Sequence, residues 1–324
     1  MLAINLLRES NIKSQVKKRK AIFFHGILSR NISMHRLFEN IKKAAQTDVS
    51  IYISGETGVG KELVARAIHA ESKRAQQPFV AVNVANFSSD LIESQLFGHK
   101  KVAFTGAINN SAGLMHTAAN GTLFLDEVTS LPTNTQAKLL RVLQERQYYP
   151  VGDVKLQEFN ASIVSASNMS FEKAIEFHQF RKDLRYRLEV IPLKVPALRE
   201  RRDDIILLFT YFLKLASNGK EWKIDKLLAK KLKQYSWPGN VRELENCARF
   251  AVAMANNAQL KIDDLPENIQ KALSTNMPVK RKKLTQRMII SALKRNSSNR
   301  NKTAEFLGIS RMTLWRKMKT YKLL

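Results

Sequence analysis

The sequence predicts an α/β domain followed by two helical modules, and three observations carry this prediction. Apolar strand-like runs alternate with helical patterns from residue 22 to about residue 195. From residue 203 onward only helical periodicity is present, and the last part of the chain is both helical and strongly basic. Alternation of strands and helices is typical of a mostly parallel sheet with helices on both faces, so the fold class is α/β.

The strand candidates of the first domain are short apolar runs separated by helical segments. Because such runs are apolar along their whole length, they fit strands that are covered on both faces. The helical segments include "KELVARAIHAES" (61–72) and "NTQAKLLRVLQER" (134–146). The predicted strands are 49–54, 79–84, 122–127, 161–167 and 190–195.

Changes in composition give the expected domain boundaries. The stretch "VPALRERRDD" places a proline and a charge cluster where the alternating pattern stops, and "STNMPVKRKK" is polar, basic and interrupted by proline. The expected parts are a basic N-terminal arm (1–21), an α/β core (22–202), an all-α module (203–273), a linker (274–283) and a small helical domain (284–324).

The charge of the chain indicates a polyanionic partner. Lys and Arg number 54 against 28 Asp and Glu, which gives a formal net charge of +26. Nucleic acid is the first candidate and an anionic membrane the second. From Lys280 to Leu324 there are fourteen Lys and Arg but one acidic residue, Glu305, so the excess is concentrated at the C-terminal end.

Cysteine usage and hydropathy exclude several classes of protein. The single cysteine, Cys247, excludes an internal disulfide and a cysteine-rich zinc site, and its apolar helical surroundings predict a buried thiol. No apolar run reaches the roughly 18 residues of a membrane span, and the N-terminus does not read as a signal peptide. We therefore expect a cytoplasmic protein with no membrane partner.

A glycine-rich loop follows the first predicted long strand and opens a helix. Its sequence "GETGVGKE" fits the G-x-x-x-x-G-K pattern, in which backbone N–H groups cradle phosphates and the lysine reaches the β- and γ-phosphates. The helix that follows adds the positive end of its dipole. The alternative is a glycine-rich turn that happens to precede a helix. The predicted nucleotide-binding residues are Gly55, Glu56, Thr57, Gly58, Val59, Gly60, Lys61 and Glu62.

Two acidic residues end a second buried strand, "GTLFLDEV". Ligands of open α/β sheets bind at the carboxyl ends of the strands, so this pair is expected beside the phosphate loop. Asp126 would hold Mg²⁺ and Glu127 would polarise the attacking water. Asn168, which ends "ASIVSASN", would orient the same water. Taken alone, the acidic pair could be an ordinary surface feature and Asn168 a turn residue.

The C-terminal module reads as a helix-turn-helix. A helix over 284–295 is followed by "NKTAEFLG", which ends at Gly308, and Ser310 caps a third helix. Leu314, Met318 and Tyr321 share the core spacing of that helix, and Trp315 completes the core or a dimer contact. The alternative is a basic three-helix docking module. The residues assigned to DNA are Arg311, Met312, Thr313, Arg316 and Lys317.

Seven motifs in order give the chain a clear resemblance over about residues 22–324. They are "GETGVGKE", "LFGHKKVAFTGA", "GTLFLDEV", "FRKDLRYRL", "VPALRERRDDI", "WPGNVRELEN" and "NKTAEFLGISRMTLWRKMKTY". The chain resembles bacterial enhancer-binding proteins, the AAA+ activators of the sigma-54 form of RNA polymerase. The resemblance implies an AAA+ P-loop ATPase core, a helical AAA+ lid and a Fis-type helix-turn-helix.

The resemblance also implies roles for single residues. ATP and Mg²⁺ are the implied cofactors, Asn83 matches an asparagine that restrains the catalytic glutamate, and Asn168 matches the first sensor. Arg181 and Arg187 match arginines that reach the ATP of a neighbouring subunit in a ring, expected to be a hexamer. Arg242 matches the second sensor, in the lid. Phe104, Thr105 and Gly106, within "AFTGA", match the loop that grips sigma-54.

Four positions around that loop depart from the pattern of the family. Val102 replaces a glycine, Lys100 and His116 replace acidic residues, and Ser162 replaces an arginine. In the family these acids and this arginine relay the nucleotide state to the loop. The sequence therefore predicts that the grip remains while its coupling to ATP is weakened or rewired.

The leading prediction is an ATP-hydrolysing activator that binds upstream DNA and remodels sigma-54 polymerase to open promoters. One alternative is a DNA-binding regulator whose nucleotide-gated ring is a scaffold that does not activate sigma-54. The other is an AAA+ remodeller of a different protein.

The expected DNA-binding end is dimeric, acts at the nucleoid and reads two-fold symmetric sites. Because the ATPase pattern starts about twenty residues into the sequence, regulation is expected from an unknown protein acting in trans or from the abundance of the protein itself.

Overall fold

The computed structural model describes residues 20–101, 109–274, 286–296, 299–307, 311–321 and 323. The chain divides into two compact units, Met1–Ser274 and Thr275–Leu324.

A five-stranded parallel sheet forms the centre of the first unit, with the strand order β4-β5-β8-β3-β9. Every strand lies within one of the predicted apolar runs, and the predicted α/β fold class is confirmed. The strands are β3 (Ile51–Ser54), β4 (Phe79–Asn83), β5 (Thr122–Asp126), β8 (Ser162–Ser167) and β9 (Ile191–Lys194).

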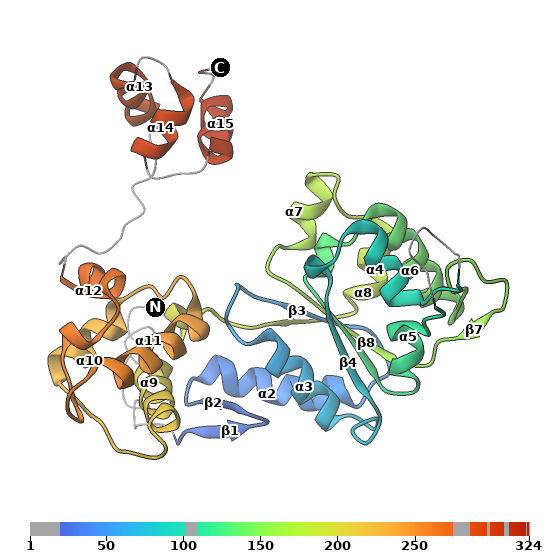
Figure 1. The fold of residues 1–324 in the computed structure, drawn as a ribbon, viewed down its shortest axis with the longest axis horizontal. Coiled ribbons are helices and arrows are strands. Elements are labelled where there is room, and N and C mark those ends of the chain that lie inside the picture. Colours follow the sequence, from blue (N-terminus) through green and yellow to red (C-terminus); the bar gives the residue numbers. More distant parts are fainter. Residues whose placement is uncertain are drawn as a thin grey trace, which may run out of the picture. The chain divides into compact units, whose positions relative to one another are not determined.

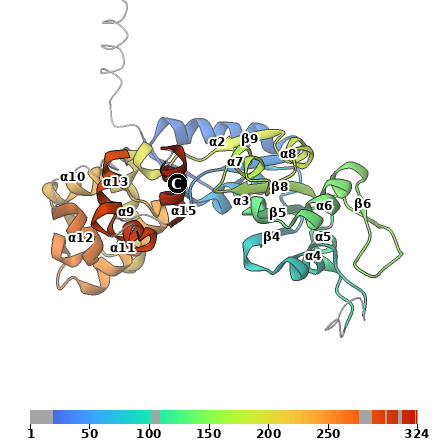
Figure 2. The ribbon, with the colours of Figure 1, turned by 90° about the horizontal axis from the view of Figure 1, so that it is seen from above.

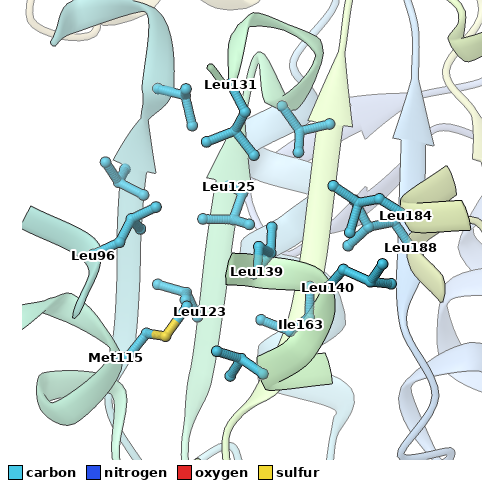
Figure 3. Close-up of a cluster of buried hydrophobic side chains, with 14 of the residues drawn as sticks. Leu96, Met115, Leu123, Leu125, Leu131, Leu139, Leu140, Ile163, Leu184 and Leu188 are labelled. Carbon is cyan, nitrogen blue, oxygen red and sulfur yellow. The ribbon is translucent and has the colours of Figure 1, made fainter. Parts of the chain in front are cut away.

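Helices cover both faces of the sheet (Figure 1 and Figure 2). On one face α2 (Ile32–Ala45) and α3 (Lys61–Glu71) enclose an apolar core that includes Phe124. On the other face Leu123 and Leu125 of the same strand, β5, pack among leucines of the opposite helices (Figure 3). Successive residues of a strand point to opposite faces, so both faces of β5 must be apolar. The helices of this second face are α4 (Ser89–Phe97), α5 (Gly113–Ala118), α6 (Thr133–Glu145), α7 (Phe171–Glu176) and α8 (Lys182–Leu188).

Short elements surround the sheet. An antiparallel hairpin pairs β1 (Ile22–Phe24) with β2 (Ile27–Ser29), and a second pairs β6 (Gln147–Tyr148) with β7 (Gln157–Glu158). The 3₁₀ turns of the unit are η1 (Val84–Asn86), η2 (Val128–Ser130), η3 (Leu198–Glu200) and η4 (Ile262–Asp264).

The rest of the first unit is a helical lid, whose apolar core includes the fully buried Trp237. One detail departs from the all-α expectation, because β10 (Lys223–Ile224) and β11 (Gln259–Leu260) form a short parallel pair. The buried Cys247 belongs to the core of this lid, as its apolar surroundings predict. The helices of the lid are α9 (Arg202–Ala216), α10 (Lys226–Gln234), α11 (Asn240–Met254) and α12 (Glu267–Ser274).

The second unit contains three helices, α13 (Gln286–Arg295), α14 (Arg300–Phe306) and α15 (Arg311–Thr320). Leu314 and Met318 are buried and Tyr321 packs against them, as the spacing predicts. Trp315 is 43% exposed, so its predicted place in the core is wrong and the dimer contact stays a prediction. Helix α15 packs against the core of this unit with Leu314 and Met318, four residues apart on one face. The adjacent Trp315 therefore lies on the outer side of the helix.

None of the helices in the described part of the chain combines the length and the apolar character that a bilayer span requires.

Candidate functional site

The glycine-rich loop lies between β3 and α3, where the sequence predicts it. Gly58 and Gly60 have φ angles of 78° and 102°, a left-handed conformation in which a side chain is strained. The loop ends on Lys61, which is only 7% exposed. Its ammonium group lies 3.2 Å from the carbonyl oxygen of Gly55 and 3.5 Å from a carboxylate oxygen of Glu127.

Several carbonyl oxygens of this loop accept hydrogen bonds from the lid. Gly58 O accepts from Val241 N at 2.9 Å, and Val59 O accepts from the buried guanidinium of Arg201 at 3.0 Å. In a trans peptide the N–H points opposite to the C=O. The N–H groups that follow these carbonyls therefore point away from the lid, as a phosphate cradle requires.

Two carboxylates stand at the end of β5, beside the loop. The Asp126 carboxylate accepts a hydrogen bond from the backbone N–H of Glu127 at 3.0 Å. Burial raises the pKa of Asp126, and the nearby Lys61 ammonium opposes this shift. Glu127 has a φ of 52°, and its two carboxylate oxygens are bound separately, one by Lys61 and the other by the backbone N–H of Asn168 at 3.1 Å.

Asn168 and Asn83 lie at the ends of the neighbouring strands. The amide of Asn168 donates to Thr57 Oγ1 at 3.2 Å, so it connects the end of β8 to the phosphate loop. Asn83 is paired in register with Asp126, but its side-chain oxygen accepts from Ala85 N at 2.9 Å, where it caps η1. The structure thus places Asn168, rather than Asn83, in direct contact with Glu127.

The sequence matches three families in succession. Residues 27–194 match the family described as Sigma-54 interaction domain, residues 199–282 the AAA+ ATPase lid domain, and residues 281–321 the Bacterial regulatory protein, Fis family. The chain belongs to the family of sigma-54-dependent activators.

Relatives of this activator align over nearly its whole length. The regulatory protein AtoC of Escherichia coli is 37% identical over 98% of this chain and 74% of its own. The phenol regulator MopR of Acinetobacter guillouiae is 40% identical over 96% of this chain and 58% of its own, so this sequence spans little more than half of that relative. The crystal structure of NtrX from Brucella abortus in complex with ATP has a TM-score of 0.70, with 34% identity over 98% of this chain and 74% of its own.

Two predicted nucleotide residues have side chains that are paired within the chain, and a third is exposed. Glu56 pairs with Arg199, and Glu62 pairs with Arg66 one turn along α3. Both carboxylates are therefore engaged by arginines in this structure. Arg242 has an exposed side chain, while its backbone N–H donates to Gly58 O at 3.2 Å.

The two candidate trans-acting arginines differ in their surroundings. Arg181 is held in a two-pronged contact with Asp183, at 3.0 and 2.7 Å. Arg187 is exposed on α8 and forms no ion pair within the described residues. Arg187 is therefore the arginine that is available to a neighbouring molecule without breaking an existing pair.

The predicted sigma-54 loop residues Phe104, Thr105 and Gly106, with Val102, lie outside the described residues. The base of the loop is described: His99 pairs with Ser111 and lies beside Val151. Lys100, which replaces an acid, forms an ion pair with Asp153 at 3.3 Å. Hydrogen bonding from the Lys155 N–H, aided by Lys100, lowers the pKa of the Asp153 carboxyl.

The other two departures from the family pattern lie away from this pair. His116 is exposed on α5, and Ser162 begins β8 at the end of the strand opposite Asn168.

At the DNA-binding end, Arg311 and Met312 open α15, and their side chains lie outside the described residues. Thr313 and Arg316 are exposed, and Lys317 is half-buried, with its ammonium 5.9 Å from the ring centre of Tyr321. The basic surface of α15 therefore lies off its apolar core face, as a DNA-contacting helix requires.

Sequence reasoning did not identify four residues that shape these sites: Arg199, Arg201, Asn240 and Asp153. The first three lie in "VPALRERRDD" and "WPGNVREL", which the sequence marks only as a boundary and as the second sensor. Their partners lie more than 140 positions away along the chain. For Asp153 the only signal was the unusual positive charge at position 100.

Proposed function

We propose that this chain hydrolyses ATP with Mg²⁺ and uses the cycle to remodel sigma-54 RNA polymerase at promoters, from DNA sites upstream. The supporting observation is the convergence of Lys61, Glu127 and Asn168 at the carboxyl ends of β3, β5 and β8. Open α/β sheets bind their ligands at this edge. The proposal follows the family to which the chain belongs and the nucleotide held by its relative NtrX.

The donor set beside the loop fits a magnesium ion that is bound together with a nucleotide. The described residues contain no group of three His, Cys, Asp or Glu that could hold a metal by themselves. Mg²⁺ commonly uses one or two carboxylates and takes its remaining ligands from phosphate oxygens and water. Asp126 would supply the carboxylate, and the cation would offset the negative charge that Asp126 and Glu127 share.

The remaining roles follow from the position of each group. Lys61 would move from Glu127 to the β- and γ-phosphates, which frees Glu127 to polarise the attacking water. Asn168, bound to Thr57 and Glu127, would position that water. Asn83 would act only after its side chain leaves Ala85.

Hydrolysis is proposed to need a ring, most simply a hexamer, because the groups that stabilise the transferring phosphoryl come partly from a second subunit. Arg187 would supply the trans charge, with Arg181 as the second candidate. The Fis-type end would hold the ring near DNA as a dimer, and Phe104, Thr105 and Gly106 would grip sigma-54.

Glu127→Gln tests the assignment directly. The variant keeps the size of the side chain and loses the charge, so it should bind ATP while hydrolysing it very slowly. Glu39→Gln, an exposed glutamate on α2 that pairs with Lys42, is the matched control and should hydrolyse like the wild type. Phosphate release and binding of a fluorescent ATP analogue measure the two effects separately.

The same proteins test the target. With an ATP transition-state mimic, the wild type should capture sigma-54 in a pull-down, and Thr105→Ala should abolish capture without changing hydrolysis. A wild type that hydrolyses ATP and binds DNA, but captures sigma-54 in no nucleotide state, contradicts the proposed function.

A further inference from the structure

The phosphate loop is joined to the lid through a glutamate side chain as well as through its backbone. The carboxylate of Glu56 accepts hydrogen bonds from both terminal nitrogens of Arg199, at 2.7 and 2.5 Å. The side-chain amide of Asn240 donates to the same carboxylate at 3.2 Å. Arg199 lies on η3, at the start of the segment that matches the lid domain, and Asn240 begins α11 within it. We call these three residues the latch.

Asn240 is the most constrained member of the latch. It is completely buried and has a φ of 53°, a left-handed conformation that asparagine tolerates better than most residues. Its side-chain oxygen accepts from Leu198 N at 2.8 Å, and its amide also donates to Thr57 O at 3.0 Å. One buried side chain therefore bonds the phosphate loop, Glu56 and the entry to the lid at once.

Asn240 of the latch lies two residues before Arg242, the lid arginine that the family motif places near the nucleotide. Val241 N and Arg242 N, the next two residues of α11, both donate to Gly58 O. A Cβ at Gly58 would stand 2.3 Å from Gly239 O, so the loop and the start of α11 are in contact with no space to spare. A shift of α11 relative to the loop must therefore move Arg242.

We propose that Glu56 is a positioning residue: through Arg199 and Asn240 it fixes the lid against the phosphate loop, and so sets where Arg242 meets the nucleotide. This proposal rests on the proposed ATPase function. It gives the loop glutamate a role that does not involve touching the nucleotide. It also makes the position of the lid depend on the conformation of the phosphate loop.

The test compares turnover at saturating ATP with nucleotide affinity in the full chain. Glu56→Ala and Arg199→Ala should each lower kcat by about three- to tenfold, the size expected for residues in direct contact. The kcat of the double variant should be no lower than that of the more impaired single variant. The preference for ATP over ADP, measured with fluorescent analogues, should fall in the same variants. The melting temperature of the nucleotide-free protein should change little, because the side chains of Glu56 and Arg199 remain 45% and 40% exposed.

Three comparisons separate positioning from a general loss of structure. In an Arg242→Ala background, Glu56→Ala should cause almost no further loss of kcat, because both act through the same arginine. The exchange Glu56→Arg with Arg199→Glu should recover part of the activity, since it restores the ion pair but not the bond to Asn240. Arg249→Ala breaks a similar exposed pair with Glu245 on α11 and should leave kcat unchanged.

The proposal is overturned if Glu56→Ala turns over within twofold of the wild type. It is equally overturned if kcat of the double variant Glu56→Ala with Arg242→Ala falls by the product of the two single fold-reductions. Should Glu56→Ala fail to fold, Glu56→Gln, which keeps an acceptor for one hydrogen bond, replaces it in every comparison. A wild type without hydrolysis contradicts the proposed function alone; the latch is then judged by the ATP preference, and an unchanged preference in the variant overturns it.

Discussion

At the scale of single residues, charge and burial decide which groups can act. Lys61 is nearly buried and lies beside Glu127, so the phosphate loop holds an ammonium group within reach of a bound phosphate. Arg201 is buried as well, and its burial lowers its pKa, while Asp204 opposes that effect. These are the two cations of the loop region that solvent barely reaches, and both contact the phosphate loop.

Cys247 gives a prediction at this scale. Burial, with the Glu243 carboxylate as a second cause, raises the pKa of its thiol to about 12. Thiolate is the reactive form of cysteine, so this group should be inert in the folded protein. In the native state a disulfide reagent such as DTNB should label less than about a tenth of the thiol within an hour, because a buried core opens only rarely. In guanidinium chloride the reagent should label all of the thiol. Rapid labelling of the native protein would show that the lid core is open.

At the scale of elements, one ion pair joins two loops where the family pattern has an acid in place of the lysine. Lys100 stands at the base of the sigma-54 loop, and Asp153 lies in the turn between β6 and β7. An acid restored at position 100 would therefore face another acid. The rewired relay that the sequence predicts has a concrete candidate in this pair.

The prediction for this pair is a charge exchange. Lys100→Glu should lower ATP-driven promoter opening by up to about fivefold, the upper range for an exposed ion pair, and adding Asp153→Lys should restore it. Lys155→Glu is the matched control and should leave promoter opening unchanged. It reverses a charge in the same turn and keeps the backbone N–H that donates a hydrogen bond to Asp153. The measurement is open-complex formation at a sigma-54 promoter, with hydrolysis followed separately. Failure of the exchange to restore opening would exclude the pair from the relay.

At the scale of the whole molecule, the charge is divided unequally between the two units. The second unit contains the basic C-terminal region, with Glu305 as its single acid after residue 280. An ATPase unit and a DNA-binding unit are thereby separated along the chain, in keeping with a protein that holds DNA at one end and works on polymerase with the other.

Binding of DNA should depend steeply on salt. Residues 275–324 form a compact unit, so a fragment of that length should bind a duplex site, with an affinity that falls as counterions are released. Replacing Arg311, Arg316 and Lys317 together by alanine should abolish the binding in a fluorescence anisotropy assay. Lys322→Ala should weaken it at all sequences alike, and Arg311→Ala should mainly relax the choice of sequence. Equal binding by the triple variant and the wild type would contradict the assignment.

Hydrolysis should depend on assembly. Because Arg187 is exposed and points to no acid of its own subunit among the described residues, the specific ATPase rate should rise with protein concentration. Arg187→Ala should lower that rate at every concentration, and mixing it with Glu127→Gln should recover part of the activity through mixed rings. A rate that is independent of concentration, in a protein that sediments as a monomer, would rule out the ring.

Local patterns were sufficient to predict most of the fold and the residues that meet at the candidate site, Lys61, Glu127 and Asn168. Buried parallel strands must be apolar along their whole length, and a phosphate loop needs glycine where φ is positive, as at Gly58 and Gly60. Both requirements are visible in a short window of sequence. The core of the C-terminal unit, around Leu314 and Met318, was visible in the same way.

Contacts between distant segments were decided only by the tertiary structure. Glu56 meets Arg199 and Asn240, and Lys100 meets Asp153, because the fold brings separate elements together. The sequence alone determined an AAA+ core, a lid and a Fis-type end. It could not determine that a glutamate of the phosphate loop binds the lid, or that a misplaced lysine has an acidic partner. A polar side chain finds its partner by position in space, and no local period or spacing carries that information.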